Sequence, residues 1–225
     1  MIYNKAMKKI ENIKLFLFDL DGTILDSLKI WNDIDLLFFK NHNLIMGEDY
    51  HIAIAPLTLE ETATYTKNTY KLDIDEEQIM KEWSDLAIKE YAENVNLKKG
   101  VKEFLDYLKN KNVHLAIATS CNEEMFKPCL ERYGIVSYFE HFYTSQNLKI
   151  NKSNTNFFKE ILNEYKIEPD QILFFEDSLA SMKCAKSLGF NVVAVMDKKW
   201  EKQKEEIIAS SDDQIEDFSQ FILNR

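Results

Sequence analysis

Two aspartates separated by a single residue stand at the polar end of an apolar run early in the chain. Residues 14–18 read KLFLF and residues 19–23 read DLDGT. On a strand, residues two apart point to the same face, so Asp19 and Asp21 can converge on one point. Converging carboxylates repel each other unless a cation compensates them, and Mg²⁺ prefers such hard oxygen ligands together with substrate phosphate. The pair therefore predicts a magnesium-dependent phosphoryl-transfer site, against the alternative of a strand that ends in a solvated Asp-Gly turn.

The elements that must position this pair are predicted from the apolar pattern of the rest of the chain. A run with no polar alternation is typical of a strand buried on both faces of a parallel sheet. Similar runs alternate with helical patterns, which predicts βαβ units and a doubly wound, mostly parallel sheet in an α/β fold. The further strands are expected at 113–119, 142–145, 172–176 and 191–196, and the helices at 100–111, 123–133, 154–165 and 178–188.

The segment between the first strand and the resumed alternation has a different character. Residues 27–95 contain no convincing strand and read as amphipathic helices over 28–42, 59–72 and 75–94, with Gly47 and Pro56 in the connections. We interpret this segment as an inserted, all-helical cap domain, and residues 1–26 and 96–225 as the α/β catalytic core. Hinges are expected near 26–28 and 95–99, because a cap has to open and close over its site.

Composition limits the classes of partner. The formal charge of −10 argues against nucleic acid and anionic membranes as the main partners, although a small phosphorylated metabolite responds to local charge. No apolar run reaches the length of a membrane-spanning helix, and charged residues follow the first five, Met1 to Lys5, so we expect a cytoplasmic protein. Three scattered cysteines predict neither disulfides nor a zinc site.

Polar residues follow the later strands where a site shared with Asp19 would be built. Thr119 and Ser120 can form a phosphate-binding concavity, and Lys152 can neutralise phosphate charge. Glu176 and Asp177 can give a metal further oxygen ligands. Each of these residues alone is also explained by a turn, a helix cap or the surface. Their order at successive strand ends favours one shared site.

At this point the chain resembles the haloacid dehalogenase-like superfamily, in the branch of phosphohydrolases that carries a helical cap on a Rossmann-like core. The first motif is DLDGT at residues 19–23, the second is Thr119, the third Lys152 and the fourth EDS at residues 176–178. The resemblance implies that Asp19 is a nucleophile that forms an aspartyl-phosphate and that Asp21 is the general acid and base. It also implies Mg²⁺ held by the side chains of Asp19 and Asp177 and by the backbone carbonyl of Asp21, with Glu176 behind them or on the metal.

Two departures from the family pattern keep alternatives open. The prolines that usually follow the third-motif lysine are missing after Lys152, and Ser181 stands where a glycine is common. Members similar to β-phosphoglucomutase share a histidine where this chain has Trp31, so the sequence favours a phosphatase of small phosphomonoesters over a sugar phosphate mutase. A catalytically silent phosphate-binding protein is a further alternative. Trp31 could line the substrate pocket or belong to a helix core. A monomer is expected, since one core and cap can complete a site.

Overall fold

The computed structural model describes residues 12–54, 57 and 59–222, and the chain divides into two compact units. One unit consists of residues up to Leu28 and from Asn96 onward, and the other of Lys29–Val95. The start of the chain, where no leader was expected, and Pro56, expected in a connection, lie outside the described residues. No described helix is both long and apolar enough to cross a membrane.

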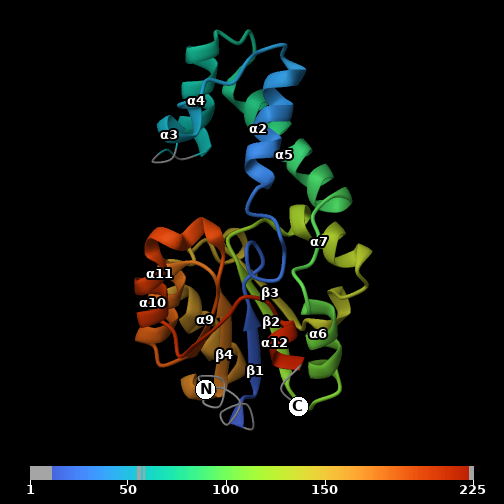
Figure 1. The fold of residues 1–225 in the computed structure, drawn as a ribbon, viewed down its shortest axis with the longest axis vertical. Helices are drawn as coiled ribbons and strands as arrows, with labels where there is room; N and C mark the ends of the chain where they lie inside the picture. The colour runs from blue at the N-terminus through green and yellow to red at the C-terminus, as the bar shows by residue number, and fades with distance from the viewer. Residues whose placement is uncertain (1–11, 55–56, 58, 223–225) are drawn as a thin grey trace. The chain divides into compact units, whose positions relative to one another are not determined.

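The first unit is built on a six-stranded sheet in which every strand pair is parallel (Figure 1). The strand order β3-β2-β1-β4-β5-β6 places β1 at the centre, between β2 and β4. This arrangement confirms the predicted α/β fold with a doubly wound sheet. The strands are β1 Leu15–Phe18, β2 His114–Thr119, β3 His141–Thr144, β4 Ile172–Glu176, β5 Asn191–Val195 and β6 Asp213–Ile215. The sequence pattern did not predict β6, because three residues are too few to show a periodicity.

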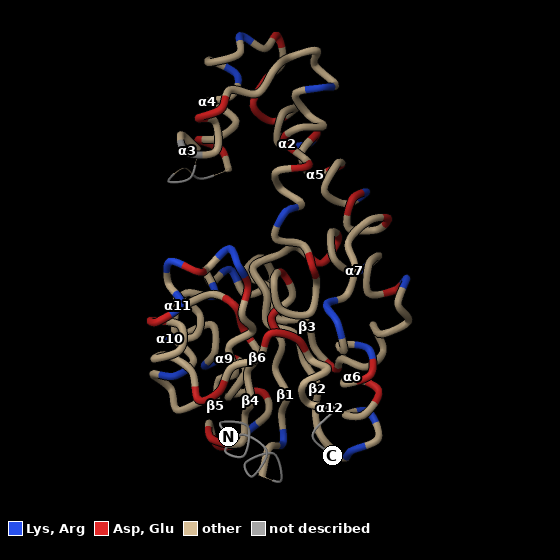
Figure 2. Tube along the Cα trace, viewed as in Figure 1, with Lys and Arg blue, Asp and Glu red and all other residues tan. Residues whose placement is uncertain are grey.

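Burial explains why the central strands carry so few polar residues. All residues of β1, β4 and β5 are buried, and the charged residues lie mainly on helices and loops (Figure 2). Phe18 of β1 stacks on Phe175 of β4, with 5.0 Å between the ring centroids. Full burial of a large apolar side chain contributes about 1.5–3 kcal/mol, so these strands contribute to the stability of the unit through their buried apolar side chains.

Helices that connect the strands lie on both faces of the sheet (Figure 1). They are α6 Val101–Lys109, α7 Glu123–Arg132, α8 Ser145–Leu148, α9 Thr155–Tyr165, α10 Leu179–Ser187, α11 Lys204–Ala209 and α12 Ser219–Ile222, with the 3-10 helices η2 Val136–Tyr138, η3 Pro169–Gln171 and η4 Lys198–Gln203. Pro128 lies inside α7, where a proline removes one backbone N–H donor. The helix nevertheless begins at Glu123, because Phe126, Cys129 and Leu130 bury its apolar face.

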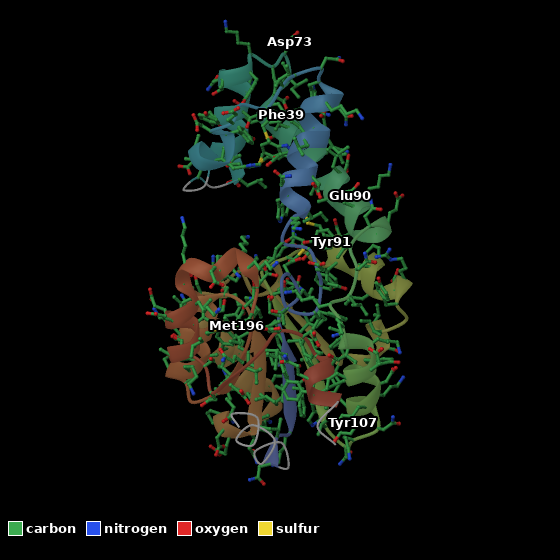
Figure 3. The ribbon with its side chains drawn as sticks, in the orientation of Figure 1. Phe39, Asp73, Glu90, Tyr91, Tyr107 and Met196 are labelled. Carbon is green, nitrogen blue, oxygen red and sulfur yellow. The ribbon has the colours of Figure 1, made fainter. Side chains whose placement is uncertain are left out.

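The second unit, Lys29–Val95, contains helices and their connections and no strand among its described residues. The division of the chain into a core of residues 1–26 and 96–225 and a cap of residues 27–95 stays a prediction. The helices of the second unit are α2 Ile30–Asn41, α3 Tyr50–Ile54, α4 Leu59–Tyr70 and α5 Glu76–Glu93. An aromatic cluster holds them together: Phe39, labelled in Figure 3, packs its ring 5.0 Å from that of Tyr50 and 4.5 Å from that of Tyr70. Asp75 caps α5 by accepting the backbone N–H of Gln78. Whether this unit acts as a cap over the site stays a prediction.

Two segments of the first unit that border the second unit are joined to each other. The backbone N–H of Asp26 donates to the carbonyl of Asn96 at 2.8 Å, and the N–H of Lys98 donates to Ile24 at 2.9 Å. Leu25 and Leu97 form an antiparallel bridge between these bonds. The two predicted hinge segments, 26–28 and 95–99, are therefore next to or part of a short stretch of paired backbone. Their motion stays a prediction.

Candidate active site

A pocket of about 200 Å³ lies at the carboxyl ends of β1, β2 and β4, and all its lining residues belong to the first unit. Ligands of open parallel sheets bind at this edge, beyond the strands. The pocket brings together the candidate residues that were predicted from separate strand ends. Its lining consists of Asp19, Asp21, Leu28, Thr119, Ser120, Lys152, Glu176, Asp177, Ser178 and Trp200.

The ammonium group of Lys152 is the centre of a buried ion cluster. Its Nζ contacts Oδ1 of Asp19 in a short hydrogen-bonded ion pair and lies 3.0 Å from Oε2 of Glu176. It also donates to the carbonyl of Ala118 on β2, at 3.4 Å. Lys152, Asp19 and Glu176 are at most 5% exposed. Removal of one partner from such a buried cluster leaves an uncompensated charge, which typically costs about 3–5 kcal/mol.

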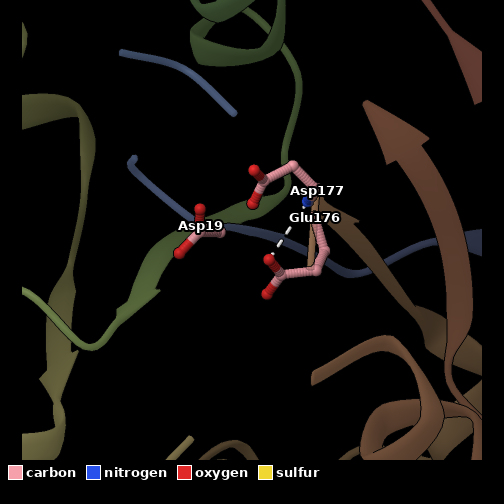
Figure 4. Close-up of side chains that lie close together, drawn as sticks. All are labelled: Asp19, Glu176 and Asp177. Carbon is pink, nitrogen blue, oxygen red and sulfur yellow. Dashed lines mark hydrogen bonds between the residues drawn. The ribbon is translucent and has the colours of Figure 1, made fainter. Parts of the chain in front are cut away.

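Glu176 orients both the lysine and the turn that follows β4. Its Oε1 accepts the backbone N–H of Asp177 at 3.0 Å (Figure 4). The same oxygen accepts the N–H of Ser178 at 2.9 Å. The same carboxylate faces Lys152 through its other oxygen. Glu176 therefore fixes the backbone that carries Asp177, in addition to its charge in the cluster.

Asp21 occupies a more open position than Asp19. Asp21 is half-buried and accepts the hydroxyl of Ser27 at 2.6 Å, whereas Asp19 is 3% exposed. Two carboxylates in one short motif thus have different environments, and such a difference can give two carboxyl groups different chemical properties. On β2, Thr119 is buried and its Oγ1 accepts the N–H of Cys121, while Ser120 is exposed at the pocket.

Burial raises the pKa values of three carboxyl groups in this site, those of Asp19, Glu176 and Asp177, because it disfavours their charged forms. Desolvation and the charge of Glu176 raise the pKa of Asp19 to about 7, although Lys152 lowers it. Desolvation also raises the pKa of Glu176 to about 7 and that of Asp177 to about 6. Burial opposes the charge of Lys152 too, but Asp19 and Glu176 outweigh it and raise the lysine pKa.

The donor set of this cluster fits a hard divalent cation. Asp19, Glu176 and Asp177 each offer a carboxylate oxygen, and these atoms lie within 4.8 Å of one another (Figure 4). A cation among them would compensate the carboxylate charges that burial and mutual repulsion disfavour. Gly22 makes room for this arrangement: its φ is +82°, and a Cβ there would collide with Oδ2 of Asp177. The predicted ligand Asp21 lines the same pocket outside the three-carboxylate group.

Trp200 is a pocket residue that the sequence pattern did not reveal. It lies in η4, within the Lys/Glu run 198–206 that reads as a solvated helix face, and its neighbours in that run are exposed. Its half-buried indole donates Nε1–H to Oδ2 of Asp177 at 2.6 Å. A single aromatic residue inside a charged run was the available signal. The predicted pocket residue Trp31 lies in the second unit, on α2, and its side chain is 45% exposed.

Known proteins with similar sequences and structures place this site in a family. The sequence model of the haloacid dehalogenase-like hydrolases matches residues 16–195. A phosphorylated carbohydrates phosphatase of Thermotoga maritima is 23% identical over 77% of this chain and 80% of its own length. A phosphoglycolate phosphatase of Haemophilus influenzae is 28% identical over 81% of this chain and 85% of its own. The magnesium-bound structure of YfnB from Bacillus subtilis matches 95% of this chain and 99% of its own, with 16% identity and a TM-score of 0.74.

The family model matches residues 16–195, which is most of this chain, so the chain belongs to the haloacid dehalogenase-like hydrolases. The predicted enzyme class, a phosphoric monoester hydrolase of this family, is confirmed by relatives that are named phosphatases.

Proposed function

We propose that this protein is a Mg²⁺-dependent phosphatase that hydrolyses a small phosphomonoester through an aspartyl-phosphate on Asp19. The observation that carries the proposal is the placement of a buried Asp19 against Lys152 at the floor of a pocket that also holds Asp21. This arrangement supports a nucleophile, a fixed positive charge and a second, more open carboxyl group within one small cavity.

In the first step, an oxygen of Asp19 attacks the substrate phosphorus and the bond from phosphorus to the leaving oxygen breaks. Asp21 gives its proton to that leaving oxygen, so the product departs as a neutral alcohol. Lys152 balances the negative charge of the transferring group, because its ammonium is held in place before reaction by Asp19 and Glu176. Thr119 and Ser120 offer hydroxyl and backbone N–H donors to the phosphoryl oxygens.

In the second step, water attacks the phosphorus of the aspartyl-phosphate, and the now ionised Asp21 takes its proton. The bond from phosphorus to the Asp19 oxygen breaks, which releases inorganic phosphate and regenerates both carboxyl groups. Covalent catalysis divides one difficult displacement into two easier ones. Mg²⁺ bound by Asp19 and Asp177, with Glu176 beside them and the Asp21 backbone as a further contact, would neutralise charge and orient the phosphoryl group.

The substrate proposal follows from the pocket size and from the relatives. A pocket of about 200 Å³ suits a phosphoryl group with a small organic part. One relative is named for phosphorylated carbohydrates and another for phosphoglycolate. A sugar phosphate mutase is the less favoured alternative, because the indole of Trp31 cannot shuttle the proton that a histidine would carry at that position.

Hydrolysis of p-nitrophenyl phosphate with and without Mg²⁺ tests the proposal, with Asp19→Asn as the matched variant. We expect turnover that depends on Mg²⁺ and falls by at least about 10³-fold in Asp19→Asn, since the nucleophile is lost while the side chain keeps its size. Rapid quenching with a phosphorus-labelled substrate should trap label on the wild-type protein alone. Equal turnover in the two proteins would overturn the proposal.

A second assay separates phosphatase from mutase. A panel of hexose 1-phosphates and phosphoglycolate is supplied, and free phosphate is measured beside isomerised sugar phosphate. We expect free phosphate to accumulate in step with substrate loss. Isomer formation without phosphate release would identify a mutase.

A further inference from the structure

Trp200 makes a direct hydrogen bond to one of the carboxylates of the acidic cluster. Its Nε1–H donates to Oδ2 of Asp177 at 2.6 Å, a short distance that is typical of charge-assisted bonds. An indole nitrogen can only donate, so this bond requires a carboxylate oxygen in the accepting role. The half-buried side chain of Trp200 also packs against the hydrophobic core of the first unit. Trp200 is therefore held on one side by packing and offers its N–H on the other.

The same oxygen of Asp177 also lies close to the backbone of Gly22. Gly22 carries no side chain where a Cβ would collide with Oδ2 and approach Cγ of Asp177. The carboxylate of Asp177 thus approaches the backbone of the first motif closely and also accepts the indole N–H. A carboxylate has two oxygens, so a bond that holds one of them leaves lone pairs for a cation. Asp177 is 3% exposed, and water has little access to replace the indole bond.

The segment that carries Trp200 is itself anchored at its N-terminal end. Met196, labelled in Figure 3, donates its backbone N–H to the carbonyl of Ile215 in β6 at 2.8 Å. Asp197 caps η4 by accepting the N–H of Lys199, and its other oxygen lies 3.1 Å from Nζ of Lys98. The side chain of Lys98 is 10% exposed, so this ion pair is better shielded than an ordinary surface pair. These anchors fix where η4 begins, two residues before Trp200.

We propose that Trp200 is a positioning residue for the metal-binding carboxylate of Asp177, a role that rests on the Mg²⁺-dependent function proposed above. Groups that hydrogen-bond to metal-ligating carboxylates orient them, and their loss typically lowers metal affinity or activity about 10- to 100-fold. Trp200 acts through Asp177 and does not require contact with the phosphoryl group. Because Trp200 lines the pocket, its ring could instead contact the substrate. Loss of a positioning role would change the affinity for the metal, whereas loss of a substrate contact would change the KM for substrate.

The test compares Trp200→Phe with Trp83→Phe in an assay that needs no turnover. Phenylalanine keeps an aromatic ring at residue 200 and removes the N–H. Trp83 is a buried tryptophan of α5 whose indole nitrogen has no hydrogen-bond partner among the described residues, so its replacement removes an N–H that orients nothing. Binding of Mn²⁺ is followed by the loss of the free-ion signal in electron paramagnetic resonance. We expect the Kd to rise about 10-fold in Trp200→Phe and to stay at the wild-type value in Trp83→Phe.

Steady-state hydrolysis of p-nitrophenyl phosphate separates positioning from substrate contact. We expect Trp200→Phe to need about 10-fold more Mg²⁺ for half-maximal rate, with an unchanged KM for substrate at saturating Mg²⁺. A raised KM for substrate with an unchanged Kd for Mn²⁺ would overturn the proposal in favour of substrate contact. Equal Mn²⁺ affinity in wild type and Trp200→Phe would also overturn it, while leaving the phosphatase proposal intact. A wild-type protein that binds no Mn²⁺ would contradict both.

A measurement on the wild-type protein covers the case in which Trp200→Phe does not fold. The chain has three tryptophans, so a ¹⁵N-labelled sample gives three indole resonances, which Trp31→Phe and Trp83→Phe assign by elimination. We expect the Trp200 indole proton to shift on addition of Mg²⁺ while the Trp83 proton does not, because only the first is bonded to a cluster carboxylate. An unmoved Trp200 resonance at saturating Mg²⁺ would overturn the proposal.

Discussion

At the scale of single residues, the site depends on buried charges that compensate one another and on a glycine that leaves room for a carboxylate. Asp19, Lys152 and Glu176 are buried as one charge cluster, so each carboxylate depends on the ammonium for compensation. Gly22 is the less obvious member of this set. Its positive φ and its contact with the Asp177 carboxylate both exclude a side chain.

Gly22→Ala tests that contact, and Gly134→Ala is its matched control. Both glycines have positive φ, +82° and +65°, so both substitutions carry the left-handed penalty of about 1–2 kcal/mol. A Cβ at residue 134 meets nothing within 4 Å, whereas one at residue 22 collides with Asp177. We expect Gly22→Ala to lower the free energy of unfolding by more than Gly134→Ala and to lose Mg²⁺-dependent turnover. Denaturant unfolding and the aryl phosphate assay measure both, and equal behaviour of the two variants would contradict the argument.

At the scale of elements, the second unit contains a buried carboxyl group that its helices hold against an imidazole. Asp35 of α2 is 8% exposed, and its Oδ2 lies 2.9 Å from Nε2 of His51 in α3. Burial raises the pKa of Asp35 above its usual value of 3.8, although the bond to His51 lowers it in part. This pair joins a long helix to a short one in a unit whose other contacts are largely aromatic.

The sign of the resulting pH dependence can be tested with Asp35→Asn. Because the folded-state pKa of Asp35 is higher than the unfolded value, its contribution to stability falls as pH rises from about 3.8 through the folded pKa. We expect Asp35→Asn to gain stability relative to wild type across that window, by at most about 1.4 kcal/mol per pH unit. Urea unfolding between pH 4 and 7 measures the difference. Asp33→Asn, at an exposed position of the same helix, should show no such trend; a flat difference for Asp35→Asn would refute the sign.

At the scale of the whole molecule, function depends on segments that are distant in the chain. The central position of β1 in the sheet order brings the ends of β2 and β4 to both sides of Asp19. Residues from 19 to 200 therefore meet in one pocket of the first unit, although 67 residues of a separate helical unit, Lys29–Val95, interrupt that unit's sequence. A cation in the cluster would join β1 to the end of β4.

Metal binding should therefore stabilise the folded chain. A ligand present at ten times its Kd adds about 1.4 kcal/mol to the free energy of unfolding, if it binds only the folded state. We expect Mg²⁺ to raise the Tm of the wild-type protein and a chelator to reverse the change. Asp177→Asn should abolish the shift, which separates specific binding from screening of the net charge of −10. Equal shifts by calorimetry in both proteins would show that Mg²⁺ acts elsewhere.

The sequence alone was sufficient for the family, the sheet and the candidate residues at the strand ends. Apolar runs predicted β1 to β5 because strands buried on both faces exclude polar residues, and the motifs around Asp19, Thr119, Lys152 and Asp177 are short and local. Such features are determined by neighbours in the chain and can be read without the fold.

Other features required the tertiary structure, because they depend on contacts between distant segments. β6 exists because β5 offers it a partner, and Trp200 meets Asp177 because η4 returns over the end of the sheet. The raised pKa values of Asp19 and Glu176 likewise arise from shared burial rather than from residue type. Sequence thus determined which groups are available for chemistry, and only packing decided how deeply they are buried and which of them touch.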